Sequence, residues 1–298
     1  MIEREYSDLV YLQFAQLLPH TDVTHGIFTR QGGYSEGAFQ GLNTSVLGGK
    51  DKYQTVARNR ELTLQALGIS PQLSITLWQV HGVNVQVFDA QDEWRTDWAN
   101  RSYWEQPWTP TSIRKGDAMI TRERGTALAL SFADCTPIVF YDPVSQAIGI
   151  AHGGWRGTAR GIVVATVEAM QEHFGSKPAD ILANIGPAIG ACCYEVGGTL
   201  QEIFEGKRDF DDEPAPQQYR KLVNESAVFS TRQLSDRKSL RLDLQTTNRN
   251  QLLMAGLLPE HIELADICTS CNRERFFSHR GDQGNTGRFP VIIMLQER

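Results

Sequence analysis

The sequence lacks any apolar run near the roughly 18 residues that a membrane-spanning helix needs. Its opening residues, MIEREYSDLVYLQ, also lack the basic-then-apolar order of a secretory signal. We therefore expect a cytoplasmic protein with no membrane partner. Basic charge is in deficit too, because 29 Lys and Arg stand against 35 Asp and Glu, for a net charge of −6. This balance argues against a nucleic-acid partner.

Cysteine is scarce, and its pattern does not suggest disulfides. The five cysteines are an odd number, in a chain long enough to bury a core without covalent links. We expect reduced thiols, available for metal or for chemistry. Cys268 and Cys271 form a lone CxxC, and no metal is expected there, because structural zinc needs a second pair with such spacing. Only 5 methionines are present, so no methionine-rich tract recruits copper.

The composition is that of a folded protein, with 41% hydrophobic and 21% charged residues. Short β-branched apolar runs alternate with helical patterns, and no internal repeat is visible. The sequence therefore predicts an α+β fold in a single domain over 1–298. Insertions are predicted near 91–115, which holds four of the six tryptophans, and near 206–239, which is highly charged, because apolar patterns resume after both.

Hydrophobic periodicity predicts the elements of this domain. Strands are predicted at 24–28, 75–79, 83–88, 118–121, 126–132, 137–141, 147–151, 181–185 and 291–295. Helices are predicted at 54–67, from near Gly157 to a closing Gly175, at 194–204, and after Asp243, which is placed to serve as an N-cap.

Three short segments carry residues that bind metals at the ends of predicted strands. They are WQVHG with His81, ADCTP with Cys135, and AHGGWRG with His152. Two imidazoles and one thiolate would leave a tetrahedral zinc ion one open position, as in catalytic sites. The same donors also suit copper. Taken singly, each residue is more often structural, and nothing local in the sequence forces the three together.

These segments belong to a longer ordered set, which is HGIFTRQGGYSEGAFQGLNTS, WQVHG, SFADCTPIVFYD, AHGGWRGTARGI, IGPAIGACCYEVG and CTSCNRERFFSHRGDQGNTGR. Together they resemble the YfiH/YlmD laccase-domain family, also called the multicopper polyphenol oxidase or peptidoglycan editing factor family. The resemblance implies a mixed β-sandwich flanked by helices, in an αββα arrangement. It implies metal ligands at His81, Cys135 and His152. It also implies phosphorolysis of purine nucleosides to free base and ribose 1-phosphate, with adenosine deaminase activity.

Several motif residues are candidates for binding the small-molecule substrates, nucleoside and phosphate. Arg30 precedes a glycine pair whose amides suit an anion, although a surface arginine in a turn is the alternative. Asn43 is placed to contact substrate or its own turn. Gly153 and Gly154 lead into the predicted helix, whose N-terminus suits phosphate, and Arg156 could assist there or cap the junction instead.

Residues nearer the C-terminus have weaker assignments. The resemblance places Cys193 in the pocket. Glu195 is a candidate general acid or base, with a surface glutamate in the first helical turn as the alternative. Arg280, Asp282 and Arg288 suggest a polar network under the site or a solvated turn.

The leading function is therefore a zinc-dependent purine nucleoside phosphorylase with deaminase activity. Protonating the leaving base would fall to Asn43 or Glu195, and holding phosphate to Arg30. The alternatives are a copper-dependent polyphenol oxidase, a cysteine hydrolase that edits peptidoglycan precursors with Cys135 and His152, and a non-catalytic metal-binding scaffold. The tryptophan-rich insertion is interpreted as a loop folded on its own domain, or as a lid over the base, a sugar-binding surface or a partner surface.

Overall fold

The structure is a computed structural model that describes residues 1–46, 51–70, 74–88 and 114–297. The tryptophan-rich segment predicted near 91–115 lies outside these residues, except for its last two positions. Among the described helices, none is long and apolar enough to cross a membrane.

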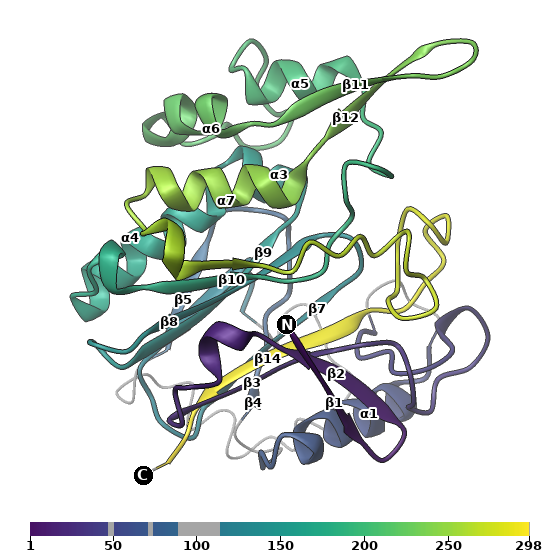
Figure 1. Cartoon of the computed structure of the whole chain (residues 1–298), viewed down its shortest axis with the longest axis vertical. Helices are drawn as coiled ribbons and strands as arrows, with labels where there is room; N and C mark the ends of the chain where they lie inside the picture. The colour runs from purple at the N-terminus through teal and green to yellow at the C-terminus, as the bar shows by residue number, and fades with distance from the viewer. Residues whose placement is uncertain (47–50, 71–73, 89–113, 298) are drawn as a thin grey trace.

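Two six-stranded sheets form the body of the protein (Figure 1). The first has the order β1 (Ile2–Tyr6), β2 (Leu9–Gln13), β3 (Val23–Phe28), β14 (Phe289–Leu295), β7 (Ala127–Phe132) and β4 (Ser74–Ile75). The second has the order β13 (Ile262–Leu264), β10 (Leu182–Ile185), β8 (Thr136–Asp142), β9 (Ala147–Gly153), β6 (Ala118–Thr121) and β5 (Val85–Phe88). Both sheets are mixed, with parallel pairs at β4–β7, β5–β6 and β10–β13.

The two sheets pack face to face around one core. Leu130 and Phe132 of β7 and Val291 of β14 meet Val139 of β8 and Ile150 of β9 in a single buried cluster. Every residue of β8, β9 and β14 is buried, which is why these strands read as continuous apolar runs. This buried stack is the scaffold on which the candidate site stands.

Helices cover the outer face of each sheet. α1 (Tyr53–Ala66) packs on the first sheet, and α4 (Ile162–Phe174) and α7 (Leu244–Met254) pack on the second. Figure 1 shows these layers, which confirm the predicted α+β class with a helix-flanked sandwich. Asp243 caps α7 as predicted, because its carboxylate accepts the Thr246 N–H at 2.9 Å.

The predicted helix from Gly157 to Gly175 is two helices instead. α3 (Trp155–Ala159) ends before Gly161, where φ is +84°, and α4 follows. A side chain at Gly161 would also lie 2.9 Å from the ring of Tyr219, so this break requires glycine. Gly175 closes α4 with φ of +71°, as the sequence predicted.

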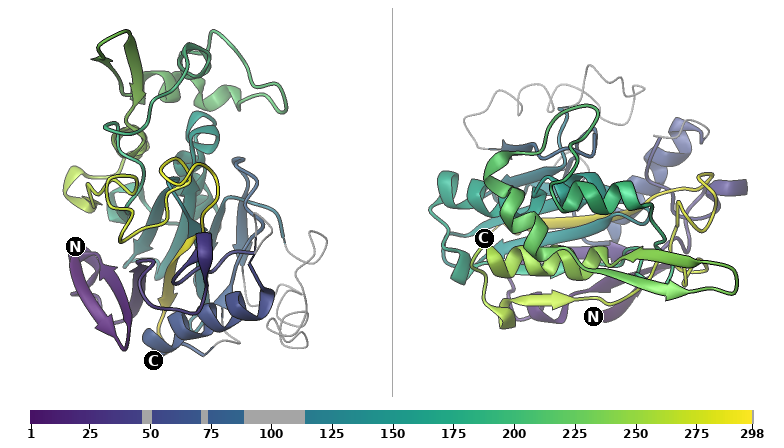
Figure 2. Two further views of the ribbon diagram at one scale, coloured as in Figure 1. Left: turned by 90° about the vertical axis from the view of Figure 1, so that its right-hand side faces the viewer. Right: turned by 90° about the horizontal axis from the view of Figure 1, so that it is seen from above.

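The predicted helix at 194–204 is shorter than expected, because α5 (Gly198–Phe204) begins only at Gly198. The preceding residues pair instead with β12 (Lys238–Leu242), since Val196 N–H donates to Leu240 and Leu242 N–H to Tyr194. The charged segment near 206–239 holds α6 (Arg220–Ser226) and β11 (Phe229–Gln233). Figure 2 shows the β11–β12 hairpin extending away from the two large sheets.

A buried histidine makes the stability of the first sheet depend on pH. His25 of β3 is 1% exposed, and its Nε2 accepts the Phe14 N–H at 2.8 Å. Burial lowers the pKa of His25 from 6.5 to about 4. The unfolded chain therefore binds a proton between these two pH values that the folded chain does not. Stability is consequently full above pH 6.5 and falls as the pH drops toward 4.

We expect this histidine to contribute a loss of roughly 3 kcal/mol across that window. In His25→Gln, which keeps an acceptor but does not titrate, the loss between about pH 7 and pH 5 should shrink. Urea unfolding at several pH values measures it. The matched control is His173→Gln, at an exposed position of α4. An unchanged pH dependence in His25→Gln would show that this histidine is not its source.

Candidate metal centre

The register of one hairpin brings two of the three predicted ligands together. β8 and β9 are antiparallel, with Thr136 opposite Gly153 and Pro137 opposite His152. Cys135 directly precedes β8, so its side chain reaches the end of β9 that carries His152. The third ligand, His81, comes from the segment before β5, and its backbone lies in the left-handed region with φ of +61°.

The three side chains form one compact group. The Sγ atom of Cys135 is 4.0 Å from Nε2 of His81, and the ring centroids of His81 and His152 are 4.8 Å apart. All the ligand atoms lie within 4.8 Å of one another. Ligands of a tetrahedral zinc ion lie roughly 3.3–3.8 Å apart, so a small inward movement would close this group on an ion. His152 is buried, whereas His81 faces solvent.

Asp117, which sequence reasoning missed, positions both histidines. Its Oδ1 lies 2.8 Å from Nδ1 of His152 and accepts the backbone N–H of His81 at 2.9 Å. Its Oδ2 accepts the N–H groups of Gly82 at 2.7 Å and Val80 at 3.2 Å. A carboxylate on Nδ1 leaves Nε2 of His152 as the ligand atom, as is usual for histidines that bind metals. The only signal in the sequence is an aspartate just before a strand.

Gly154 keeps the space beside the ligands open. A Cβ at this position would lie 3.0 Å from the Cys135 sulfur and 3.1 Å from Cδ2 of His81. Any side chain would therefore crowd the group where an ion or a substrate atom must enter. The neighbouring Gly153 has a packing reason instead, because a Cβ there would lie 2.8 Å from Ile138.

The residues of this group shift one another's pKa values. Burial would raise the pKa of the Cys135 thiol, but the imidazoles of His152 and His81 outweigh burial and lower it. Burial would lower the pKa of His152, but Cys135 and Asp117 raise it. The thiol is thus poised to lose its proton and act as a thiolate ligand.

The loop that carries Cys135 is tied to the C-terminal loop. Asp134 has φ of +84°, a conformation that costs a non-glycine residue on the order of 1 kcal/mol. Its carboxylate accepts the Thr269 hydroxyl at 2.7 Å and the Arg280 N–H at 2.6 Å. Its carbonyl accepts the Ile189 N–H at 2.9 Å. These contacts hold Cys135 toward the two histidines.

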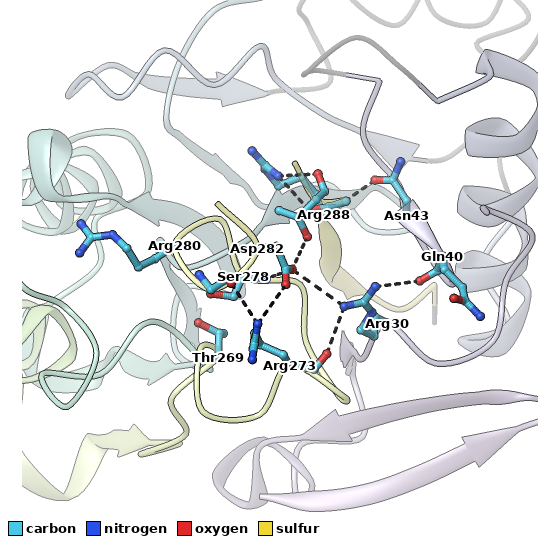
Figure 3. A network of polar contacts seen from close by, with 12 residues as sticks. Arg30, Gln40, Asn43, Thr269, Arg273, Ser278, Arg280, Asp282 and Arg288 are labelled. Atoms are coloured by element: carbon cyan, nitrogen blue, oxygen red, sulfur yellow. Dashed lines mark hydrogen bonds and ion pairs between the residues drawn. The ribbon is translucent and has the colours of Figure 1, made fainter. Parts of the chain in front are cut away.

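Arg30 belongs to a polar network rather than to the His–Cys group (Figure 3). It donates to the carbonyls of Arg273 at 3.1 Å and Gln40 at 3.2 Å, and lies 4.0 Å from the Asp282 carboxylate. Asp282 also accepts the Thr286 hydroxyl at 2.8 Å and lies 3.8 Å from Arg273. The network around Asp282 thus joins Arg30, Arg273 and Thr286, whereas the predicted members Arg280 and Arg288 make no direct contact with Asp282 among the described interactions.

Asn43 forms hydrogen bonds both within its own turn and with more distant residues. Its Nδ2 donates to Asp51 at 2.8 Å and to the Ser45 carbonyl, while its Oδ1 accepts the N–H groups of Ser45 and Arg288. Arg280 points away from the network in Figure 3 and donates to the carbonyl of Glu195 at 2.8 Å.

The other predicted site residues have partners elsewhere. The Glu195 carboxylate pairs with Arg237 and, at 3.7 Å, with Arg241. It precedes α5 and so is not in a first helical turn, because its segment pairs with β12. Arg156 is 40% exposed and pairs with Asp212 at 3.6 Å.

The thiol of Cys193 lies in a second group, with Cys192, Cys268 and Cys271. The expectation that the CxxC stands alone is therefore wrong. Its partner pair is the adjacent Cys192 and Cys193, whose spacing gives no sequence signal.

The fold and the His–Cys group define a mixed α/β protein with a candidate metal centre. A family model described as multi-copper polyphenol oxidoreductase laccase matches residues 24–296, and the chain belongs to this family. It is 35% identical to "Purine nucleoside phosphorylase YlmD" of Geobacillus stearothermophilus, over 94% of this chain and 92% of that protein. It is 32% identical to "Purine nucleoside phosphorylase" of Bacteroides thetaiotaomicron, over 96% of each chain.

Solved structures agree with this membership. The crystal structure of YlmD from Geobacillus stearothermophilus matches with a TM-score of 0.79 at 33% identity, over 99% of this chain and 98% of that one. The hypothetical protein YfiH of Bacillus licheniformis matches with a TM-score of 0.78 at 34% identity, over 99% of both chains. The resemblance inferred from the motifs is confirmed.

Because Asp117 orients His152 and the His81 loop, its removal should weaken metal binding. We expect Asp117→Asn to lower zinc affinity by about 10–100-fold, since an amide cannot accept all the donors that the carboxylate accepts. Competition with a coloured chelator measures the affinity. The control is Asp211→Asn, at a position whose side chain is 95% exposed. Equal affinity in Asp117→Asn and the wild type would contradict the role.

Proposed function

We propose that this protein is a zinc-dependent purine nucleoside phosphorylase. It would convert adenosine, inosine, guanosine and methylthioadenosine to free base and ribose 1-phosphate, and would also deaminate adenosine. One observation carries the proposal: His81, Cys135 and His152 converge from three segments at a point that Gly154 leaves open. Three protein ligands and one open position are typical of catalytic zinc. The relatives' names, purine nucleoside phosphorylase, support the phosphorolysis.

The chain's own residues prepare the centre for its ion. His152 and Cys135 present a nitrogen and a sulfur from one hairpin, and Asp117 fixes the tautomer of His152. A bound zinc ion would supply a Lewis acid that polarises a substrate oxygen. His81, which is exposed, lies on the side from which a nucleoside would approach.

Phosphate requires a cation near this centre, and Arg288 is better placed than Arg30. Burial lowers the pKa of Arg288, while Cys135 and Asp134 lie near enough to raise it. Within the described residues, only its Nη1 has hydrogen-bond partners, the carbonyls of Thr286 and Gly287. The remaining donors of its guanidinium suit an oxyanion. Arg30 is engaged by carbonyls and by Asp282.

A second candidate is a cysteine hydrolase that acts on peptidoglycan precursors. Cys135, His152 and Asp117 are arranged as nucleophile, base and orienting carboxylate, and the lowered pKa of Cys135 favours a thiolate. The metal requirement separates the two functions, because this hydrolase would work without a metal. A polyphenol oxidase would need copper and an oxidisable phenol.

Purified protein given inosine should release hypoxanthine only when phosphate is present. In Cys135→Ala we expect phosphorolysis and the zinc affinity of the His–Cys group to fall together, each by at least about 10-fold, because an open site with two remaining ligands holds zinc poorly. His173→Gln is the control for purification and folding. Release of hypoxanthine by the metal-free wild type would contradict the zinc proposal. Hydrolysis of a peptide or amide by the metal-free wild type would favour the cysteine hydrolase.

The phosphate assignment makes a separate prediction. Arg288→Ala should raise the KM for phosphate by about 10–100-fold, the equivalent of one charged hydrogen bond, and leave the KM for inosine nearly unchanged. Arg30→Ala serves as the matched comparison. Initial rates at varied phosphate measure both. If Arg30→Ala has the larger effect, phosphate binds nearer the Asp282 network. If both KM values rise equally, Arg288 does not hold phosphate.

A further inference from the structure

Four cysteines that the proposed reaction does not use lie together outside the His–Cys group. The sulfurs of Cys192, Cys193, Cys268 and Cys271 are all within 4.8 Å of one another. Cys271 is 3.5 Å from Cys192 and 3.4 Å from Cys193, sulfur to sulfur. Two of the four are exposed and two half-buried, and all are free thiols. A cluster of four thiols is unusual enough to require an explanation.

The pairing of two strands explains how the two cysteine pairs meet. β10 and β13 are parallel neighbours, so the loops that follow them leave the same edge of the sheet. Backbone bonds continue past both strands, because Ala188 N–H donates to Ile267 at 3.2 Å and Thr269 N–H donates to Ala188 at 3.0 Å. This pairing at Ala188 brings residues 192–193, which follow in the next turn, close to 268–271.

We propose that these four sulfurs bind one zinc ion as a structural tetrathiolate site. With Zn–S bonds of about 2.3 Å, tetrahedral geometry places sulfurs about 3.8 Å apart, which is slightly longer than the two Cys271 separations and within the 4.8 Å that bounds the cluster. Four protein ligands close the coordination sphere, so such an ion stabilises the fold and takes no substrate. On binding, the thiols release their protons to solvent.

A disulfide explains the cluster less well. Cys271 lies almost equally far from two sulfurs, whereas a disulfide would choose one and bring it to about 2.0 Å. The fourth sulfur, of Cys268, accepts the Gly190 N–H at 3.2 Å. This hydrogen bond fixes the position of the fourth sulfur within the cluster.

The proposed ion would also steady the first metal centre. Thr269 lies between the two cysteines of the CxxC, and its hydroxyl donates to Asp134. The loop between Cys271 and Arg280 supplies the second donor, the N–H of Arg280. The loop at 268–280 would therefore position the Cys135 thiolate through its bonds to Asp134, the residue before Cys135.

The test uses the full chain with Cys135→Ala, so that any thiolate bound to metal must come from the cluster. The protein is purified under reducing conditions, and its zinc is measured by elemental mass spectrometry and X-ray absorption. We expect about one zinc ion per chain, surrounded by about four sulfurs at about 2.3 Å. Replacing zinc with Co²⁺ should give the intense visible bands of tetrahedral cobalt bound to thiolates.

A second variant, Cys135→Ala with Cys271→Ser, locates the ion. We expect its sulfur-bound zinc to be lost or to fall at least about 10-fold in affinity, and its melting temperature to drop. If this variant does not fold, the number of sulfurs around zinc in the first variant, measured by X-ray absorption, still tests the proposal. Three results would overturn the proposal. The first is a disulfide among the four cysteines, and the second is iron in place of zinc. The third is that, after metal-free Cys135→Ala has been incubated with Zn²⁺, all four thiols still react with a thiol reagent.

Discussion

The candidate metal centre depends on one buried carboxylate. Asp117 is fully buried and receives hydrogen bonds from an imidazole and from three consecutive backbone N–H groups. Its desolvation would be costly if these donors were absent. With them it joins β9, which carries His152, to the loop that carries His81, although 71 positions separate these histidines in the sequence. Burial would raise the pKa of Asp117, but the His152 bond and the backbone donors lower it, so the carboxylate stays charged.

The position of this carboxylate follows from the second sheet. Asp117 directly precedes β6, which pairs with β9 so that Ala118 lies opposite Ala151, next to His152. On the other side of β9, β8 begins directly after Cys135. Two ligands and their orienting acid therefore stand at one end of three neighbouring buried strands. A site on packed strands is held more precisely than a site on loops, which suits a centre whose ligands must converge within tenths of an ångström.

The sequence identifies the three candidate ligands, but it does not show that they lie close together in the fold. His81, Cys135 and His152 are recognisable because each ends an apolar run next to glycine or proline. Their meeting depends on hairpin register and on a hydrogen bond to a residue with no motif, so only the family resemblance indicated it. The sandwich strands were predictable because nearly all of their residues are buried and apolar.

Several errors in the prediction share one cause, which is backbone pairing that the local sequence pattern does not show. β1, with the sequence IEREY, is exposed along its whole length and shows no apolar alternation, so the first hairpin was missed. The segment from Tyr194 to Val196 has helical character but finds open backbone groups on β12, and tertiary pairing overrides the local pattern. The thiol cluster was missed likewise, because an adjacent Cys192 and Cys193 resemble no ligand motif until β10 and β13 pair.

With a metal ion bound at each, the two groups would divide their tasks by coordination number. Three ligands with a glycine beside them would leave room for a substrate, whereas four ligands would leave none. The groups are connected, because the carboxylate of Asp134, whose φ is positive, accepts hydrogen bonds from Thr269 and Arg280. Both donors come from the loop that the four thiols would clamp. The geometry of Cys135 therefore depends on residues more than a hundred positions away, and loosening that loop should disturb the first centre without touching any of its ligands.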